Sequence, residues 1–226
     1  MLVQEMYSRR STMCRKLLVL WGRAAPLAAL LLIAAALVYA GAPQLHLRDT
    51  KGTVHTNAEW ASAKAILLFF VTTDCPVGNS YVPEMNRIRD AYAGRGVVVW
   101  AVQTDTTTAE PAVAKYAAEY RYGFPLLLDP RQQLVNLTGA AITPQAAVLS
   151  PDGRVLYLGR IDNRVEDFGK QRPQATHADL REALDEVLAG RPVSHPRTKS
   201  IGCAINRVGQ SGTLRRSGTP PQSAAD

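Results

Sequence analysis

Cys75 is the residue of this chain whose surroundings most favour chemistry. It follows the continuous apolar run 65–71 and directly precedes Pro76, and proline is favoured at the first position of a helix because no N–H is needed there. A thiol at a helix N-terminus lies near free amides and the positive end of the helix dipole, and both stabilise the thiolate. The thiolate is the form that attacks disulfides, peroxides or metals. The alternative is that Cys75 is a small buried hydrophobic residue.

The other two cysteines decide which thiol could pair with Cys75. Cys14 lies in a basic N-terminal segment and is expected to be lost with it, which leaves Cys75 and Cys203. In an oxidising compartment these two thiols can pair. Cys203 is interpreted as a resolving thiol, which attacks a mixed disulfide or a sulfenic acid on Cys75. A structural disulfide and an unpaired Cys203 stay open as alternatives, because connectivity does not follow from sequence.

The hydrophobic pattern predicts the elements that must position Cys75. Continuous apolar runs at 65–71 and 97–102 are typical of central strands covered on both faces. Apolar residues three and four apart predict an amphipathic helix over 78–93. The other expected elements are a hairpin over 45–55, a short helix capped by Asn57, a helix over 111–122, a strand over 126–128, a helical turn over 132–137, hairpin strands 146–149 and 155–158, and a last helix over 178–188. This order predicts an α/β fold with a mixed sheet between helices.

The N-terminal segment has the order of an export signal. Basic residues precede the apolar run 27–38, and small residues follow at Val38 and Ala40. The apolar run is shorter than the roughly 20 residues of a spanning helix. We therefore predict a signal peptide over 1–40, with an uncleaved signal anchor as the alternative, and a periplasmic or otherwise extracytoplasmic location for the remainder.

The basic charge of the chain belongs to its two ends. The net charge is +4 over 1–40 and +5 over 191–226, whereas 41–190 carries 15 basic and 17 acidic residues. A nucleic-acid-binding domain would need a basic face on the folded part, so this class is excluded. We expect a folded domain over 41–190 and a C-terminal extension over 191–226 that carries Cys203 and is disordered from 207 onward.

Two segments resemble the redoxin (AhpC/TSA-like) members of the thioredoxin superfamily. Residues 69–85 are similar to the strand, cysteine turn and helix of that family, and residues 142–153 are similar to its second motif. The resemblance implies a thioredoxin-like three-layer α/β/α sandwich with a central mixed sheet. It also implies that Thr143 and Pro144 form a pair with a cis proline, which faces Cys75 and positions the substrate. Stretches near 157–173 and 201–205 look like a bacterial subfamily of exported redoxins.

Departures from the family pattern reduce the number of reactions that the chain is expected to carry out. Gly78 stands where a dithiol thioredoxin has its second cysteine, and Asn79 stands where a copper chaperone has one. Thr72 fits the Thr-x-x-Cys pattern of peroxiredoxins, but Leu68 replaces the proline of that pattern. The peroxide pocket is therefore only partly present.

These observations predict an exported thiol oxidoreductase. Its expected substrates are protein thiols and disulfides or a small peroxide, with an electron donor that the sequence does not identify. It is expected to contact a membrane only through an N-terminal anchor. The expected catalytic residues are Cys75, Cys203, Thr72, Thr143 and Pro144.

Two alternatives accompany this expectation. The first is a peroxiredoxin-like antioxidant peroxidase, in which an arginine such as Arg160 must reach Cys75. The second is a non-catalytic binding module with a permanent disulfide. No cofactor is expected, because the chain has no haem-attachment, flavin or nucleotide motif. No metal site is expected either, because the four histidines lack ligand spacing.

Overall fold

The computed structural model describes residues 44–208 and 214–215 of the 226-residue chain. The predicted signal segment lies outside the described residues, as does the tail apart from 207–208 and 214–215. One compact unit begins at Gln44. Within the described ranges, no helix combines the length and the apolarity that a membrane crossing requires.

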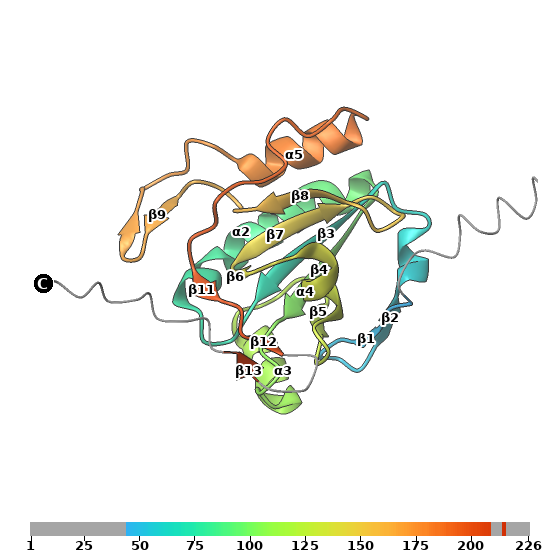
Figure 1. The fold of residues 1–226 in the computed structure, drawn as a ribbon, viewed down its shortest axis with the longest axis vertical. Coiled ribbons are helices and arrows are strands. Elements are labelled where there is room, and N and C mark those ends of the chain that lie inside the picture. The colour runs from blue at the N-terminus through green and yellow to red at the C-terminus, as the bar shows by residue number, and fades with distance from the viewer. Residues whose placement is uncertain (1–43, 209–213, 216–226) are drawn as a thin grey trace, which may run out of the picture. The chain divides into compact units, whose positions relative to one another are not determined.

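A mixed five-stranded sheet forms the centre of the domain (Figure 1). The strand order is β5-β4-β3-β7-β8, in which β3 and β5 flank β4 in parallel and β7 pairs antiparallel with both β3 and β8. The strands are β3 (Ala65–Val71), β4 (Val97–Gln103), β5 (Leu126–Leu128), β7 (Gln145–Leu149) and β8 (Val155–Gly159). The predicted mixed sheet is confirmed.

The uninterrupted apolar run of β3 follows from its central place. All its residues are 0% exposed. Leu67 and Phe69 belong to the core on one face of the sheet, whereas Leu68 and Phe70 belong to the core on the other. Successive side chains of a strand point to opposite faces, so a strand covered on both faces has no polar alternation. Complete burial of a large apolar side chain contributes about 1.5–3 kcal/mol.

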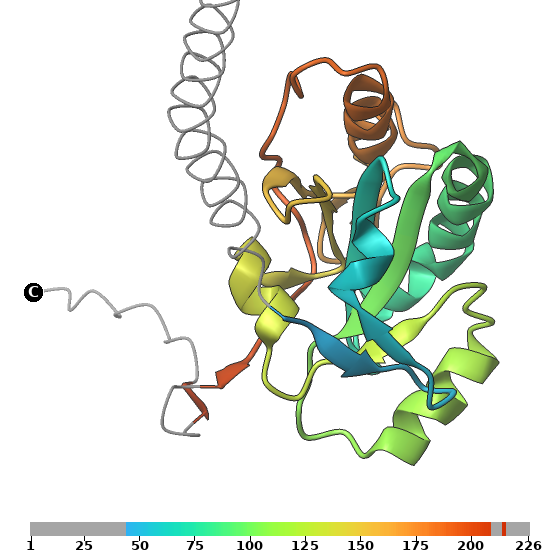
Figure 2. The same ribbon diagram turned by 90° about the vertical axis from the view of Figure 1, so that its right-hand side faces the viewer.

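Helices cover the two faces of the sheet unequally. One face packs against α2 (Pro76–Tyr92), α3 (Glu110–Glu119) and α5 (Asp179–Leu188). α2 and α5 lie side by side in both ribbon views (Figures 1 and 2). The other face packs against α4 (Gln133–Thr138), the 3-10 helix η2 (Asn57–Trp60) and the hairpin of β1 (His46–Arg48) and β2 (Val54–Thr56). This arrangement confirms the three-layer α/β/α sandwich.

One helix cap differs from the sequence prediction. Thr56, not Asn57, caps η2, because its side chain accepts the Ala58 N–H while Glu59 accepts the Thr56 N–H. α2 begins at Pro76, as the proline after Cys75 predicts and two residues before the apolar pattern begins. Cys75 therefore becomes the N-cap itself.

Several very short strands were not expected. They are β6 (Ile142–Thr143), β9 (Val165–Asp167), β10 (Lys170–Gln171), β11 (Cys203–Ala204), β12 (Arg207–Val208) and β13 (Leu214–Arg215). β12 pairs antiparallel with β13, so these four residues of the tail predicted to be disordered are in strands. We call residues 191–208 the C-terminal arm. The arm leaves α5, crosses the end of the sheet and places β11 against β6 (Figure 1).

Candidate active site

Cys75 lies at the junction between the central strand β3 and helix α2. Its side chain is 0% exposed, and its Sγ accepts the Gly78 N–H at 3.4 Å. The Gly78 N–H is one of the free amides of the helix N-terminus, and the sequence predicts such an amide beside a thiol at this position. The thiol proton points to the Thr143 carbonyl oxygen, 3.0 Å from Sγ. Two fixed backbone groups therefore orient the sulfur of Cys75.

Thr143 and Pro144 face Cys75 from the opposite side of the site. The Thr143–Pro144 peptide bond is cis, and Thr143 is fully buried. β6 carries Thr143 to this position, since β7 continues directly from Pro144 next to the central strand β3. The pair that the family resemblance implies beside Cys75 is therefore present in the structure.

Cys203 reaches the same place from the C-terminal arm. β11 pairs antiparallel with β6 so that Cys203 lies opposite Thr143, and the Thr143 hydroxyl donates to the Cys203 carbonyl at 3.4 Å. Both Cys75 and Cys203 are free thiols in the structure. Burial raises the pKa of Cys203 to about 12, and the neighbouring Cys75 and Asp74 add to the rise. Cys203 is therefore held as a protonated thiol.

Thr72 contacts Cys75 through its backbone rather than through its hydroxyl. Its carbonyl accepts the Cys75 N–H at 3.5 Å, and its hydroxyl donates to the Asp74 carboxylate. The Asp74 carboxylate thus has a partner within its own turn, and Thr72 shapes the loop before the helix. In the described part of the chain, no three His, Cys, Asp or Glu side chains converge as a metal site would require.

A polar network around Asn79 supports the cysteine turn, and sequence reasoning missed it. Tyr116 donates to the Asn79 side-chain oxygen at 2.8 Å, and the Asn79 amide donates to the Thr73 carbonyl at 3.3 Å and to Tyr120 at 3.2 Å. Tyr116 also shares a hydrogen bond of 2.9 Å with Tyr122. Burial raises the pKa of Tyr116 to about 12, so its hydroxyl stays a donor. The three tyrosines at 116, 120 and 122 were the feature of the sequence that could have indicated this network.

Arg160 does not act on Cys75 in this arrangement. Its guanidinium binds the Asp179 carboxylate through Nε at 2.8 Å and an Nη at 3.0 Å. Asp162, two residues further along the chain, accepts the Tyr81 hydroxyl at 2.5 Å. Arg160, the arginine that a peroxide pocket would require, is therefore paired with Asp179 at the start of α5.

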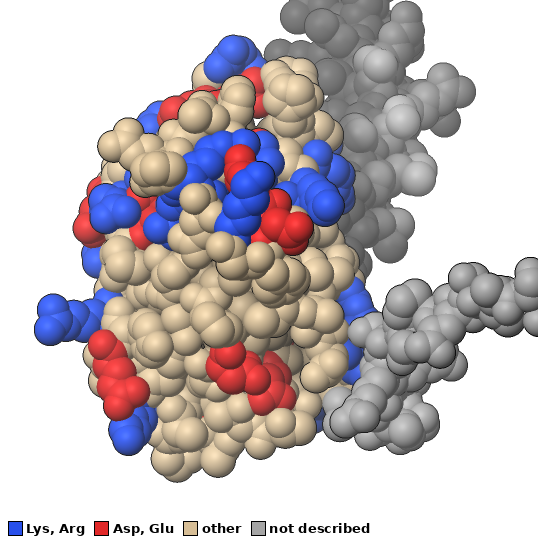
Figure 3. All heavy atoms as spheres, turned by 90° about the vertical axis from the view of Figure 1, so that its left-hand side faces the viewer, with Lys and Arg blue, Asp and Glu red and all other residues tan. Residues whose placement is uncertain are grey.

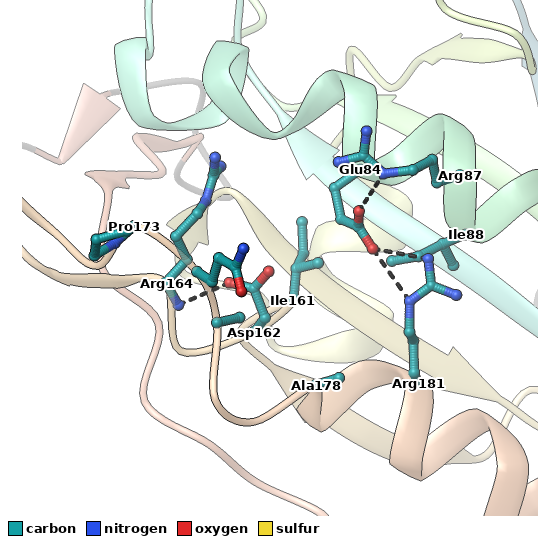
Figure 4. A pocket seen from close by; sticks show the side chains of 11 residues that line it. Glu84, Arg87, Ile88, Ile161, Asp162, Arg164, Pro173, Ala178 and Arg181 are labelled. Atoms are coloured by element: carbon teal, nitrogen blue, oxygen red, sulfur yellow. Dashed lines mark hydrogen bonds and ion pairs between the residues drawn. The ribbon is translucent and has the colours of Figure 1, made fainter.

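A separate hollow of about 300 Å³ lies between α2, α5 and the loop after β8 (Figure 4). At its wall Glu84 accepts hydrogen bonds from Arg87 at 2.7 Å and from Arg181 at 2.8 Å. Arg164 stacks over the Tyr81 ring, 4.4 Å from its centroid. Glu84 thus joins α2 to α5 through its contact with Arg181.

The face of the molecule that carries β11 is divided by charge. Figure 3 shows many charged side chains gathered in the upper part of this face, an area without lysine, arginine, aspartate or glutamate across its middle, and a smaller acidic group below. A separate hollow is lined by residues that include Arg160, Lys170, Arg172 and Lys199.

Comparison with known proteins agrees with this geometry. A hypothetical protein from Sinorhizobium meliloti of known structure is 31% identical, with a TM-score of 0.62 over 73% of this chain and 91% of that chain. A candidate thioredoxin from Neisseria meningitidis is 19% identical, with a TM-score of 0.51 over 66% of this chain and 89% of that chain, and shows the same fold.

A curated relative has a defined activity. Thiol-disulfide oxidoreductase ResA from Bacillus thuringiensis is 26% identical over 113 residues, which is 50% of this chain. The match spans 58% of the length of that relative. A family model for the AhpC/TSA family matches residues 38–158, more than half of the chain, and covers β3, Cys75 and the Thr143–Pro144 pair. The chain therefore belongs to the AhpC/TSA family and has a thioredoxin-like fold.

Proposed function

We propose that this protein is an exported thiol–disulfide oxidoreductase in which Cys75 is the nucleophile and Cys203 the resolving thiol. One observation carries the proposal: Thr143 holds the Cys75 thiol with its carbonyl and has Cys203 opposite it in the strand pair. Two cysteines that lie 128 positions apart in the sequence thus meet at one residue. Neither contact is needed for a buried cysteine that only fills the core.

The first step is attack by the Cys75 thiolate on one sulfur of a protein disulfide. A bond forms between Cys75 and that sulfur, the substrate S–S bond breaks, and the other substrate sulfur leaves as a thiolate that takes a proton from water. The Gly78 N–H at the start of α2 donates to the sulfur that makes this attack. Thr72, Thr143 and Pro144 position the reacting sulfur atoms.

The second step resolves the mixed disulfide. Cys203 loses its proton and attacks the Cys75 sulfur, the Cys75–Cys203 disulfide forms, and the remaining substrate sulfur leaves as a thiol. Overall, one substrate disulfide is reduced to two thiols and the cysteine pair is oxidised to one disulfide. A dithiol reductant then returns the pair to thiols by the same exchange chemistry.

The raised pKa of Cys203 supports this division of roles. A thiol whose pKa lies far above neutral pH is a poor first nucleophile at that pH. The activity in the name of the Bacillus relative is of the same class. The export signal expected over 1–40 and an oxidising compartment agree with a disulfide substrate. The engagement of Arg160 by Asp179 argues against a peroxidase.

Trapping of the mixed disulfide tests the proposal. The reduced full chain is mixed with a small disulfide-bonded test protein and quenched with acid, and the products are resolved by non-reducing mass spectrometry. We expect Cys203→Ser to accumulate a covalent adduct through Cys75, and the unaltered chain to pass on to an internal disulfide. Cys75→Ser is the matched control and should form no adduct. An adduct through Cys203 in the Cys75→Ser chain, or no adduct in any variant, would overturn the proposed roles.

A further inference from the structure

The C-terminal arm pairs with the outer edge of β8 before it reaches the cysteine pair. The Leu158 N–H donates to the Pro196 carbonyl at 3.0 Å, and the Thr198 N–H donates to the Leu158 carbonyl at 3.4 Å. These two bonds form a parallel bridge between Leu158 and Arg197. β8 is the last strand of the central sheet, so the arm covers an edge that would otherwise be unpaired.

The Thr198 side chain closes a ring of three hydrogen bonds with Tyr157 and Arg160. The Arg160 N–H donates to the Thr198 hydroxyl at 3.0 Å, and the Tyr157 hydroxyl donates to the Arg160 carbonyl at 2.6 Å. The Tyr157 and Thr198 hydroxyls lie 2.7 Å apart. Because the single Tyr157 hydroxyl proton points to a carbonyl, which can only accept, the Thr198 hydroxyl donates to Tyr157. Each member of the ring therefore donates one hydrogen bond and accepts one.

The Tyr157 part of this ring lies in the protein interior. Tyr157 is 0% exposed and belongs to the core that also contains the buried face of α5. Burial raises the pKa of its hydroxyl, so the hydroxyl keeps its proton at neutral pH. Removing the Thr198 hydroxyl would leave a buried hydroxyl and a backbone N–H without this partner, which is costly away from water. The ring therefore favours one position of the arm on β8.

Gly159 allows the arm to come this close to β8. A Cβ added to Gly159 would overlap the Thr198 hydroxyl oxygen and lie 2.9 Å from the Thr198 backbone nitrogen. Any other residue at this position would push the arm away from β8. The same limit applies at Gly202, where an added Cβ would overlap the Thr143 carbonyl oxygen. The segment 198–202 is thus in close contact with the domain at both of its ends.

Two fixed points bound the segment that leads to Cys203. Thr198 is held on β8 by the ring, and Cys203 lies opposite Thr143 on β6. Within the described residues, the buried Ser200 hydroxyl between them has no hydrogen-bond partner, and Lys199 is exposed. The five steps of chain from Thr198 to Cys203 span about 18 Å when fully extended. The place where the arm leaves β8 therefore limits where the Cys203 sulfur can lie.

We propose that Thr198 is a positioning residue for the resolving thiol, because its hydrogen-bond ring fixes the start of the short segment that carries Cys203 to Cys75. This inference rests on the proposed function and adds a residue to it. The arm is ordered before the resolving step, so the attack of Cys203 on the Cys75 sulfur loses little further conformational freedom. The ring thus raises the effective concentration of Cys203 at Cys75.

Equilibrium with glutathione measures this effective concentration. The full chain is equilibrated with mixtures of reduced and oxidised glutathione, and the fraction with a Cys75–Cys203 disulfide is determined by non-reducing mass spectrometry. Thr198→Val keeps the shape of threonine but removes the hydroxyl. It should lower the effective concentration by about tenfold and slow resolution of the mixed disulfide by a similar factor. Thr198→Ser keeps the hydroxyl and should restore both values.

A matched variant separates positioning from a purely structural role. Thr176→Val removes a hydroxyl outside the arm, which accepts a hydrogen bond from the Asn163 side chain at 2.7 Å. It should lower the thermal unfolding midpoint and leave the effective concentration within about twofold. If Thr198→Val also lowers only the unfolding midpoint, Thr198 merely stabilises the fold and the inference is overturned. An equal fall in effective concentration in Thr176→Val would overturn it too.

Tyr157→Phe breaks the same ring from its other side. This variant removes the acceptor of the Thr198 hydroxyl and should also lower the effective concentration. Because both substitutions break one ring, Tyr157→Phe combined with Thr198→Val should lower the effective concentration little more than either does alone. Effects that multiply in the double variant would show that the two residues act separately and would overturn the ring.

The two readouts separate failure of this inference from failure of the proposed function. Glutathione exchange reports on the cysteine pair whether or not a protein substrate reacts. A tenfold fall in the effective concentration in Thr198→Val, in a chain that forms no mixed disulfide with the test protein, would keep the ring and overturn the oxidoreductase. A mixed disulfide that Thr198→Val resolves at the unaltered rate would keep the oxidoreductase and overturn the positioning role.

Discussion

Cys75 and Cys203 lie against the same residue, Thr143, but very different parts of the chain hold them. Cys75 follows a strand with every residue fully buried and caps a long helix. Cys203 belongs to a two-residue strand in an arm without a core of its own, and its neighbour Ala204 is exposed. The nucleophile thus lies at the end of the central strand, and the second thiol lies in a short strand at the edge of β6. The difference predicts which substitutions change the chemistry, which change the fold and which change neither.

The largest effect is expected at the rigid position. Cys75→Ser should lower disulfide reduction by about a thousandfold or more, because the nucleophile itself is lost. The serine hydroxyl is similar in size to the thiol, so the thermal unfolding midpoint should change little. Turnover of a disulfide-bonded test protein and thermal unfolding are the measurements. Retained turnover in Cys75→Ser would contradict the assignment of the nucleophile.

The core beneath Cys75 should dominate the stability. Phe69 is 0% exposed on β3, so Phe69→Ala should lower the free energy of unfolding by about 3–5 kcal/mol. Ile205→Ala in the arm should cost less, about 2 kcal/mol, because Ile205 is 9% exposed and lies at the margin of the second core. Denaturant titration of both variants measures the difference. Equal losses would show that the arm and the core unfold as one unit.

A cysteine at another position should be able to replace Cys203 as the resolving thiol. Cys203→Ser should slow turnover by roughly a hundredfold and leave the mixed disulfide to accumulate. A Cβ at Gly78 would lie 3.5 Å from the Cys75 Cβ, within the range of about 3.5–4.5 Å that a disulfide needs. Adding Gly78→Cys to Cys203→Ser should therefore restore turnover. If it forms the new disulfide but turnover stays low, Cys203 has a role beyond resolution.

The rigid region could be predicted from the sequence because its signals are long. Seven apolar residues define β3, and Pro76 marks the start of α2. The pairing of β11 with β6 could not be predicted, since two-residue strands carry no periodicity and their pairing depends on tertiary contact. Gly202 was the only local signal, because a glycine beside a cysteine in an irregular segment is compatible with a close backbone approach.

Stability should also depend on pH through Cys203. Its folded pKa is raised above the ordinary value of 9.0 to about 12. Below pH 9 the thiol is protonated in both the folded and the unfolded state, so its contribution is complete. Between these two values the unfolded state releases the proton first, and stability falls as the pH rises. The reduced chain should lose stability relative to Cys203→Ser from pH 9 upward, measured by denaturant titration. Parallel pH profiles of the two proteins would contradict the burial of Cys203.

The smallest effect is expected at Arg160. Its guanidinium binds Asp179 and is one-third exposed, so Arg160→Ala should cost at most about 1 kcal/mol of stability. Thiol–disulfide exchange should change by less than about twofold, because Arg160 does not contact the reacting sulfur atoms. Stopped-flow reaction with a peroxide is the sharper measurement. A fast peroxide reaction that Arg160→Ala abolishes would favour the peroxidase instead.

Non-reducing peptide mapping of the cysteine pair tests the central claim most directly. The purified chain is fully reduced, treated with one equivalent of a disulfide-bonded test protein, and mapped before and after graded dithiothreitol. The account predicts that Cys75 and Cys203 begin as free thiols, become one intramolecular disulfide as the test protein is reduced, and return to thiols with mild reductant. A Cys75–Cys203 bridge that resists reductant from the start, or a pair that never forms one, would contradict the account.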